Sequence, residues 1–510
     1  MPSLSPHKPR GCDMLPPEIR DLIVQALIQD GCTLAPLAAV SRRWQVQVER
    51  HTFARIRLTP SRLADFRSII QRNRALVDYI WFCLELDDYD CTKCAPGHMP
   101  SPDLGESMKS ITVTDTVKGP ITASFEELFS VLSTWDPVGD LVLDISIYSP
   151  SDSEHWFKYL TFLPDYHRQT TPTKVSDDAE HGWVSGYQED PTPCPAFLKD
   201  FHEVMLEGPF ASYQAECAWW DRLPSVPAVT SVLLRQQNRR RWKPHVLPHM
   251  FARFPRLEEV HYEPWREWNS IQKSTDNSFL VLFESIRRFN IPLKKLVVFE
   301  NFNQQYPTMM QDLLHTDSFR QPNPAVGRMV ALASFPLEHL AASFLVDARD
   351  IFTTETTREW PNLTSVVLTS KVLRPDEDPI AIRAMLRAAA GAAMRMPRLE
   401  TMEIWHGRKG LAAVFRYRVV RSARRATITW RATWGLTMGA SLIRAWKAVV
   451  QRRYDDTWSL GVVQERLDPA TITSHGDAIL SLKLSGRVIR LVSLQQIRME
   501  QKALEGVKTV

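Results

Sequence analysis

The segment Trp360-Pro-Asn-Leu-Thr-Ser-Val-Val-Leu368 sets the pattern that predicts the fold of this chain. Leu363, Val366 and Leu368 have the form apolar-x-x-apolar-x-apolar, which indicates a short strand with a buried face. Pro361 stands just before this run, and a proline disfavours the helical conformation at the residue that precedes it. The segment therefore predicts a helix that stops at the proline and a strand that follows it.

The same pattern recurs along most of the chain, usually after a proline. The first strand-like stretch along the chain is Val77–Phe82. The pattern then occurs at Val142/Ile145/Ile147, Val229/Val232/Leu234, Leu257/Val260/Tyr262, Leu293/Leu296/Val298, Leu337/Leu340/Ala342, Leu363/Val366/Leu368 and Leu399/Met402/Ile404. Each unit has one strand and one helix with a single buried face, so the units must stack to bury it. The fold class predicted is therefore α/β.

We expect residues 59–407 to form an irregular β/α array with parallel strands inside and helices outside. Its shortest intervals, 26 and 28 residues, are similar to those of leucine-rich repeats, which run about 20–29 residues. The longer intervals require surface loops, and segments rich in Pro, Ser, Thr, Gly and Asp place these near 91–118 and 163–192. The alternative is an ordinary α/β domain whose strands share a pattern by chance.

The first sixty residues predict a bundle of three short helices. Leu15-Pro16-Pro17-Glu18 opens the first helix, because proline is tolerated where backbone N–H groups lack helical partners, and Asp30-Gly31 ends it. We expect Thr33 to cap a second helix and Trp44 to lie on a third. The spacing of apolar residues predicts a small core containing Leu22, Leu27, Val40 and Trp44.

Residues 12–58 resemble the F-box family. Leu15-Pro16 and Glu18-Ile19 match the opening of its pattern, and Val40-Ser41-Arg42-Arg43-Trp44 matches its closing run. The sequence departs from that pattern at the Asp30-Gly31-Cys32 turn and at Pro36. The resemblance implies binding to the Skp subunit, and through it to the cullin scaffold, of a Skp–cullin–F-box (SCF) ubiquitin ligase. The docking residues that it implies are Leu15, Pro16, Ile19, Ile23, Leu34 and Leu37.

This resemblance predicts a substrate-recognition adaptor, in which the array holds an unknown protein close to the ligase. An adaptor performs no bond chemistry, and the sequence has no Gly-x-Ser-x-Gly nucleophile motif, phosphate-binding loop or His-Glu-x-x-His motif. We therefore expect neither enzymatic activity nor a cofactor. The alternatives are a helical cap on an interaction scaffold without a ligase, and a nucleic-acid-binding protein.

The C-terminal part, residues 408–510, changes character and predicts an α+β cap on the array. We expect antiparallel strands at 414–420 and 426–432, a helix at 441–453, and closing strands around Leu480–Leu484 and Val488–Leu494. Residues 408–454 contain twelve Arg or Lys and no acidic residue. Arginines that alternate with aromatic residues suit stacking on single-stranded nucleic acid, but alternation along a strand also places them on opposite faces. The run Arg239-Arg240-Arg241 is expected on a solvated face.

The seven cysteines are irregularly spaced, which is typical of reduced thiols inside a cell. Cys91 and Cys94 form a C-x-x-C pair, and Cys83 and His98 could complete a tetrahedral zinc site. The alternatives are thiols without a ligand, which we favour, and a redox pair. We therefore expect no metal.

Charge and hydropathy add little to the functional prediction. The net charge of +4 is small for 510 residues and does not by itself indicate a polyanionic partner. No run approaches the ~20 apolar residues that a membrane span needs, and the N-terminus lacks the apolar region of a signal peptide. These features favour a cytoplasmic or nuclear protein with no membrane partner.

Overall fold

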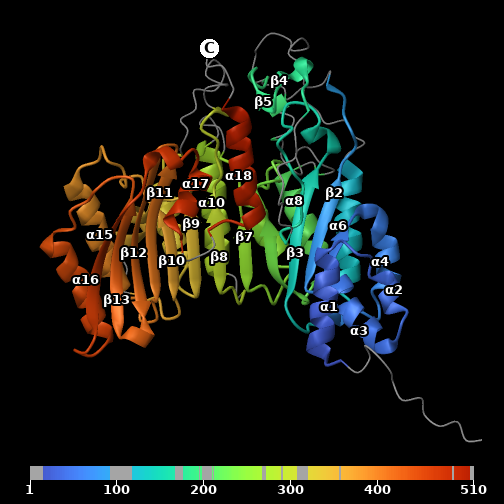
Figure 1. Cartoon of the computed structure of the whole chain (residues 1–510), viewed down its shortest axis with the longest axis horizontal. Coiled ribbons are helices and arrows are strands. Elements are labelled where there is room, and N and C mark those ends of the chain that lie inside the picture. Colours follow the sequence, from blue (N-terminus) through green and yellow to red (C-terminus); the bar gives the residue numbers. More distant parts are fainter. Residues whose placement is uncertain are drawn as a thin grey trace, which may run out of the picture.

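A strand forms at each of the segments with the apolar-x-x-apolar-x-apolar pattern, and these strands join one large sheet. A computed structural model describes residues 15–91, 118–166, 176–193, 196–197, 201, 210, 212–266, 272–288, 291–306, 320–354, 358–484 and 488–505. Within these residues the strand order of the sheet is β1-β2-β3-β6-β7-β8-β9-β10-β11-β12-β13-β14, and β4 and β5 form a separate pair. Figure 1 shows the strands side by side, from the blue N-terminal end to the orange C-terminal part.

The strands follow the chain in nearly sequential order across the sheet. They are β1 Arg55–Leu58, β2 Tyr79–Glu85, β3 Leu141–Tyr148, β4 Trp183–Val184, β5 Tyr187–Gln188, β6 Val229–Leu234, β7 Glu259–Tyr262, β8 Lys295–Phe299, β9 His339–Ser343, β10 Ser365–Thr369, β11 Thr401–Arg408, β12 Leu411–Val420, β13 Arg425–Ala432 and β14 Ser459–Arg466. Neighbours in the large sheet are parallel up to β11 and between β13 and β14. β12 is antiparallel to both β11 and β13, which confirms the predicted antiparallel pair.

Helices cover both faces of this sheet. They are α1 Pro17–Gln29, α2 Ala35–Ala38, α3 Arg42–Ala54, α4 Leu63–Ile69, α6 Lys118–Leu132, α8 Tyr213–Arg222, α9 Leu247–Phe251, α10 Gln272–Arg288, α13 Pro324–Ala333, α14 Ala348–Phe352, α15 Pro379–Ala393, α16 Gly439–Arg453, α17 His475–Leu482 and α18 Leu491–Leu504. Helices α4 to α16 share one continuous apolar core with the sheet, and we call that side the outer face. Helices α17 and α18 pack on the opposite side, the inner face.

Strand β10 shows why the decisive segment is so apolar. Its Val366 and Leu368 point into the outer core, whereas Val367 between them belongs to the inner cluster. A parallel strand that is buried on both faces reads as a nearly continuous apolar run. The chain is therefore an α/β protein with a large, mostly parallel sheet.

The closing strands predicted near the C-terminus are wrong, because residues 480–482 belong to α17 and residues 491–494 belong to α18. Ser474 caps α17 by accepting a hydrogen bond from the backbone N–H of Asp477 at 3.1 Å. Ile479 and Leu482 of this helix are buried at the inner face, whereas Leu480 is exposed. The alternation of leucines in the sequence thus resembled a strand, but burial follows the helical period.

A glycine on β11 allows α17 to lie close against the sheet. A Cβ atom at Gly407 would stand 2.4 Å from the Cβ of Ala478, which is closer than two carbon atoms can approach. Any larger residue at this position would push α17 away from the inner face. The requirement is one of space, because Gly407 is absent from the glycines that have a positive φ.

The N-terminal residues form three helices, α1 to α3, but their core differs from the predicted one. Val24, Trp44 and Val48 form the buried centre. Leu22 and Val40 are 59 % and 65 % exposed, so their prediction as core residues is wrong. The reason is that α1 turns its Val24 side toward α3, and that α3 begins at Arg42, after Val40.

A further expectation concerns the N-cap of α2. Thr33 does not cap α2, because the N-cap residue is Leu34 and no side chain caps this helix. Ser41 instead caps α3 by accepting a hydrogen bond from the backbone N–H of Trp44.

None of the described helices combines the length and the apolar character needed to cross a membrane.

Candidate functional site

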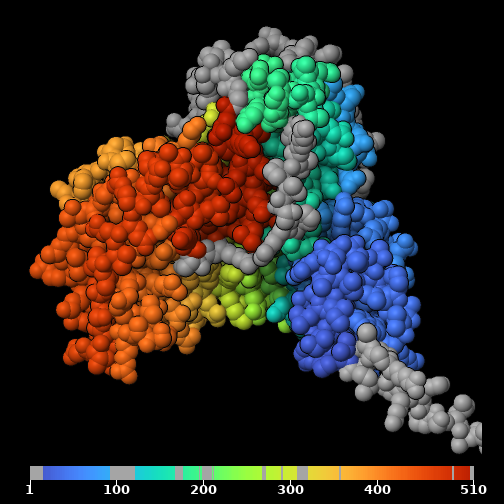
Figure 2. All heavy atoms as spheres, in the orientation of Figure 1, coloured from blue at the N-terminus to red at the C-terminus, as the bar shows by residue number. Residues whose placement is uncertain are grey.

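The inner face of the sheet is a candidate binding surface, and the C-terminal helices α17 and α18 occupy part of it. Figure 2 shows the red C-terminal residues lying over the green and orange parts of the chain. Apolar side chains of α17, α18 and the segment between them pack on Val297, Val367, Trp405 and Val414 of the sheet. A partner could therefore reach this part of the inner face only by displacing the C-terminus.

A buried carboxylate anchors the start of α18. Glu263, which directly follows β7, accepts hydrogen bonds from the hydroxyl of Ser493 at 2.6 Å and from the backbone N–H of Arg490 at 2.7 Å. It also accepts one from the backbone N–H of Gln236 at 3.0 Å. Burial raises the pKa of Glu263, although these hydrogen bonds oppose the shift. This carboxyl group therefore ties the strand end to α18 rather than facing solvent.

An ion pair inside an aromatic enclosure anchors the other end of α18. The guanidinium group of Arg239 lies 2.8 Å from the carboxylate of Glu500, and each side chain is 1 % exposed. It also lies over the ring of Trp265 at 4.2 Å and over that of Phe201 at 5.0 Å. Asn303 donates a further hydrogen bond to Glu500 at 2.9 Å. The polar atoms of both partners thus meet inside the protein.

The arginine run that contains Arg239 is not the solvated face that we expected. Arg239 and Arg240 are buried, and Arg240 forms an ion pair with Asp152. Each guanidinium group pairs with a carboxylate from a distant part of the sequence. This pairing allows the charged side chain to be buried. Nothing in the local sequence identifies Asp152 or Glu500 as these partners, because both lie among ordinary surface-type residues.

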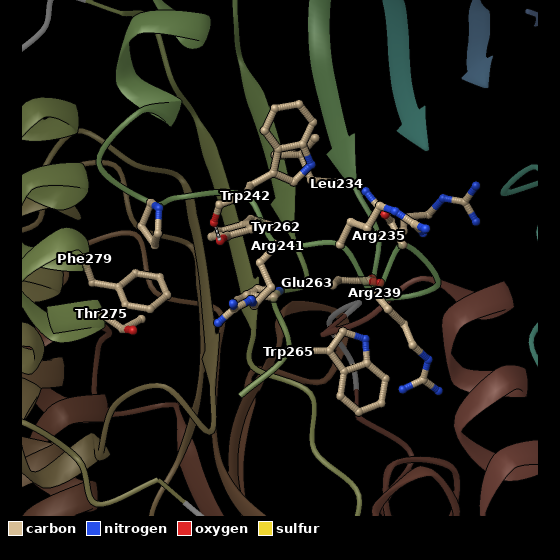
Figure 3. A pocket seen from close by; sticks show the side chains of 14 residues that line it. Leu234, Arg235, Arg239, Arg241, Trp242, Tyr262, Glu263, Trp265, Thr275 and Phe279 are labelled. Atoms are coloured by element: carbon tan, nitrogen blue, oxygen red, sulfur yellow. Dashed lines mark hydrogen bonds between the residues drawn. The ribbon is translucent and has the colours of Figure 1, made fainter. Parts of the chain in front are cut away.

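A pocket beside this ion pair is too small for an organic ligand. It lies between the end of β6, the arginine run and α10, and Figure 3 shows Arg241, Trp242 and Tyr262 among the side chains that line it. Its volume is about 20 Å³, which suits roughly one water molecule. The pocket therefore gives no support for a small-molecule substrate.

A row of polar side chains on the inner face remains partly accessible. Glu259, Lys295 and His339 are in register on β7, β8 and β9, and each is half-buried. The ammonium group of Lys295 lies 3.0 Å from the carboxylate of Glu259. Burial would raise the pKa of Glu259, but hydrogen bonds from His261 and Lys295 lower it to about 2. Burial and the charge of Lys295 lower the pKa of His339 to about 4.

The predicted docking residues lie on the N-terminal bundle. Pro16 and Ile19 are exposed, and Ile19 is 42 % exposed. The remaining four are half-buried; they are Leu15, Ile23, Leu34 and Leu37. Ile23, Leu34 and Leu37 pack against the core around Trp44. Because α1 and α2 both contact α3, the bundle brings these residues onto one small unit.

The structure describes two of the four residues that were considered as zinc ligands, Cys83 and Cys91. Cys83 is fully buried in β2 on the inner-face side of the sheet, beside Trp81 and Tyr79. Cys91 lies beyond the strand and is half-buried, with its thiol 3.5 Å from a carboxylate oxygen of Glu180. Cys94 and His98 lie outside the described residues. The burial of Cys83 fits the interpretation favoured from the sequence, in which its thiol has no metal ligand role, because buried cysteines commonly fill space in an apolar core.

The aromatic residues of the basic C-terminal segment face the core. Phe415, Tyr417 and Trp430 are buried in the outer core, and Trp434 packs against it. Among the arginines, Arg416 forms an ion pair with Glu403, and Arg431 forms one with Glu465. The aromatic rings are consequently not presented for stacking on bases.

Comparison with known proteins adds a family without a known activity. Residues 290–490 match a family of unknown function, DUF6546. The matched region begins just before β8 and ends just before α18, so it contains the C-terminal part of the sheet and α17. No curated protein shows significant similarity to the chain.

Proposed function

We propose that this protein is the substrate-recognition adaptor of an SCF-type ubiquitin ligase and that it binds a Skp subunit through its N-terminal helices. The observation that carries the proposal is the exposed apolar side of α1. Ile19 and Leu22 are spaced three residues apart, so they share one side of the helix. They are 42 % and 59 % exposed, and Val40 next to α3 is 65 % exposed.

The size of the bundle explains why these residues indicate a partner. Its own core uses only Val24, Trp44 and Val48 as fully buried members. Five large aliphatic side chains are exposed on a module of about forty residues, namely Ile19, Leu22, Ile28, Val40 and Val46. A concentration of exposed apolar groups is typical of a docking surface. The F-box pattern in residues 12–58 supplies the identity of the proposed partner.

The rest of the chain would hold the protein substrate, in the manner of an irregular leucine-rich-repeat-like array. The N-terminal bundle lies at one end of the molecule in Figure 2, where docking to a ligase would leave the sheet and its helices accessible. Such an adaptor acts by proximity, because it raises the effective concentration of substrate lysines near the ubiquitin-carrying enzyme. It would do so in the cytoplasm or the nucleus.

Two other functions compete with this proposal. An interaction scaffold would use the same large surface without binding Skp, and the exposed apolar side of α1 favours the adaptor. A nucleic-acid-binding protein would use residues 408–454. The burial of Phe415, Tyr417 and Trp430 speaks against that alternative.

The test is binding of the full-length protein to a purified Skp subunit. We expect the double variant Ile19→Asp/Leu22→Asp to weaken binding at least about tenfold, because two charges would enter an apolar interface. Both side chains are exposed, so the bundle should fold, and an unchanged circular dichroism melting curve would verify this. Binding of the double variant with wild-type affinity would refute the docking proposal.

The matched control is Ile69→Asp on α4. Ile69 is an isoleucine with 61 % exposure, but it lies outside residues 12–58. This variant should bind Skp as the wild type does. If the wild-type protein binds no Skp subunit at all, the scaffold becomes the better description.

A further inference from the structure

Three potential metal ligands from distant parts of the chain come together between the end of β2 and the turn before β4. Cys91 follows β2, whereas Glu180 and His181 belong to a single 3₁₀ turn, Ala179–His181, just before β4. One ligand atom from each of these three residues lies within 4.8 Å of the other two. Cys91 and Glu180 are 89 residues apart in the sequence. The fold therefore assembles a sulfur, an oxygen and a nitrogen donor that no local motif contains.

We propose that Cys91, Glu180 and His181 bind a Zn²⁺ ion. Zinc accepts thiolate, imidazole and carboxylate ligands at roughly 2.0–2.3 Å in a tetrahedral arrangement. Such bond lengths place neighbouring ligand atoms between about 3 and 4 Å apart, so the observed separations need only a small closure around the ion. Magnesium and calcium prefer sets made of oxygen ligands, which excludes them here.

The surroundings of His181 support its role as a ligand. Its Nδ1 atom lies 2.7 Å from a carboxylate oxygen of Asp178, and the ring is buried. Zinc-binding histidines commonly place a carboxylate on the ring nitrogen that does not hold the metal, which orients the ring and increases its basicity. The contact with Asp178 therefore assigns Nε2 of His181 to the metal.

The carboxylate of Asp178 has a second partner, Lys158. The ammonium group of Lys158 lies 2.5 Å from Asp178. The lysine therefore neutralises the orienting carboxylate, while Glu180 supplies the negative charge that a cation would meet.

Binding would exchange a proton for the metal. In the structure the Cys91 thiol donates a hydrogen bond to the carboxylate of Glu180. Zinc binds the thiolate, so the thiol proton leaves to solvent as the sulfur–zinc bond forms.

The ion would act as a staple between the end of β2 and the turn before β4. These segments lie beside the C-terminal helix, because α18 contacts β5. Three protein ligands leave one coordination position for water or another donor. This site does not include Cys83, and it does not depend on the proposed ligase function.

The test uses the full-length protein, stripped with a chelator and titrated with Zn²⁺ against a chromophoric competitor. We expect one tightly bound zinc per chain, and Co²⁺ in its place should give a thiolate charge-transfer band and the visible spectrum of a tetrahedral site. Cys91→Ser and His181→Gln should each weaken zinc binding at least about tenfold. Asp178→Asn should weaken it by about 10–100-fold, as loss of an orienting partner does.

Two matched controls separate the site from general effects of substitution. Cys32→Ser removes an exposed thiol elsewhere, and His249→Gln removes a histidine that contacts Asp221 at 2.9 Å and does not belong to the group of three ligands. Both should retain zinc. Retention of zinc by His181→Gln would show that any bound zinc belongs to another ligand set and would overturn the proposal. Failure of the wild-type chain to bind zinc would overturn it as well.

Discussion

At the scale of single residues, the covered inner face holds the imidazole of His475 in its neutral state. His475 at the start of α17 stacks on Phe302 with ring centroids 4.2 Å apart, and its Nε2 atom lies 2.9 Å from the side-chain oxygen of Asn301. Burial lowers the pKa of His475 to about 3. The folded state therefore takes up a proton at this position only at a pH where the unfolded chain is already protonated.

This residue should make the protein less stable in acid. An unfolded histidine titrates near pH 6.5, so between about pH 6.5 and 3 the unfolded state binds a proton that the folded state excludes. The free energy of unfolding should then fall by about 1.4 kcal/mol per pH unit for this one residue as the pH decreases. His475→Gln should reduce the slope by that amount in urea titrations between pH 6 and 4.

The control is Val297→Ala in the same apolar cluster. It should lower the free energy of unfolding at every pH, by about 1–3 kcal/mol for the lost packing, and leave the slope unchanged. An identical slope in His475→Gln and the wild type would contradict the prediction.

At the scale of elements, α18 is held to the sheet by polar contacts at both ends. Glu263 binds its first turn, and Arg239 meets Glu500 near its last turn. Buried ion pairs contribute little net stability, but removal of one partner leaves a buried charge without compensation. The attachment of this helix consequently depends on a few exact partners as well as on apolar contacts.

Glu500→Gln should therefore destabilise the protein by about 3–5 kcal/mol, because it leaves the guanidinium group of Arg239 buried without its counter-charge. The measurement is the urea midpoint together with the rate of proteolysis in the C-terminal region. Glu505→Gln is the matched control, since Glu505 follows the same helix and is exposed. It should change stability by less than about 0.5 kcal/mol. Equal midpoints for the two variants would show that the ion pair does not hold α18.

At the scale of the whole molecule, the strands differ greatly in how well they are covered. β8, β9 and β10 have neighbours on both sides and core clusters on both faces. β14 is the last strand of the sheet, and most of its residues are exposed. In stacked arrays, local unfolding is expected to begin at a terminal strand, because that strand is hydrogen-bonded to a neighbour on one side only.

Hydrogen exchange should report this gradient. Amides of β14 that lie in the ladder with β13 should exchange at least about 100-fold faster than those of β8 to β10, because the edge can open without disturbing the centre. Mass spectrometry of peptic fragments would measure this difference. Equal protection at both places would mean that the sheet opens only as one unit.

The sequence determined the class of fold and the strands from β2 to β13 of the large sheet, but it did not predict the edge strands β1 and β14. The pattern of Leu363, Val366 and Leu368, with its proline, marks β10 from a handful of neighbouring residues, and it succeeds elsewhere for the same reason. Burial on both faces of a parallel strand leaves a strong local signature. The antiparallel pair β12 and β13 was equally visible from its alternation.

Only the tertiary structure decided what covers the inner face and which charged residues meet. Arg239 and Glu500 are 261 residues apart, and Cys91 and Glu180 are 89 apart. The apolar residues at 480–484 and 488–494 have a spacing that suggested strands, but packing against the sheet places them in or next to the helices α17 and α18. A sequence carries its periodicity locally, whereas the pairing of a buried charge depends on where distant segments come together.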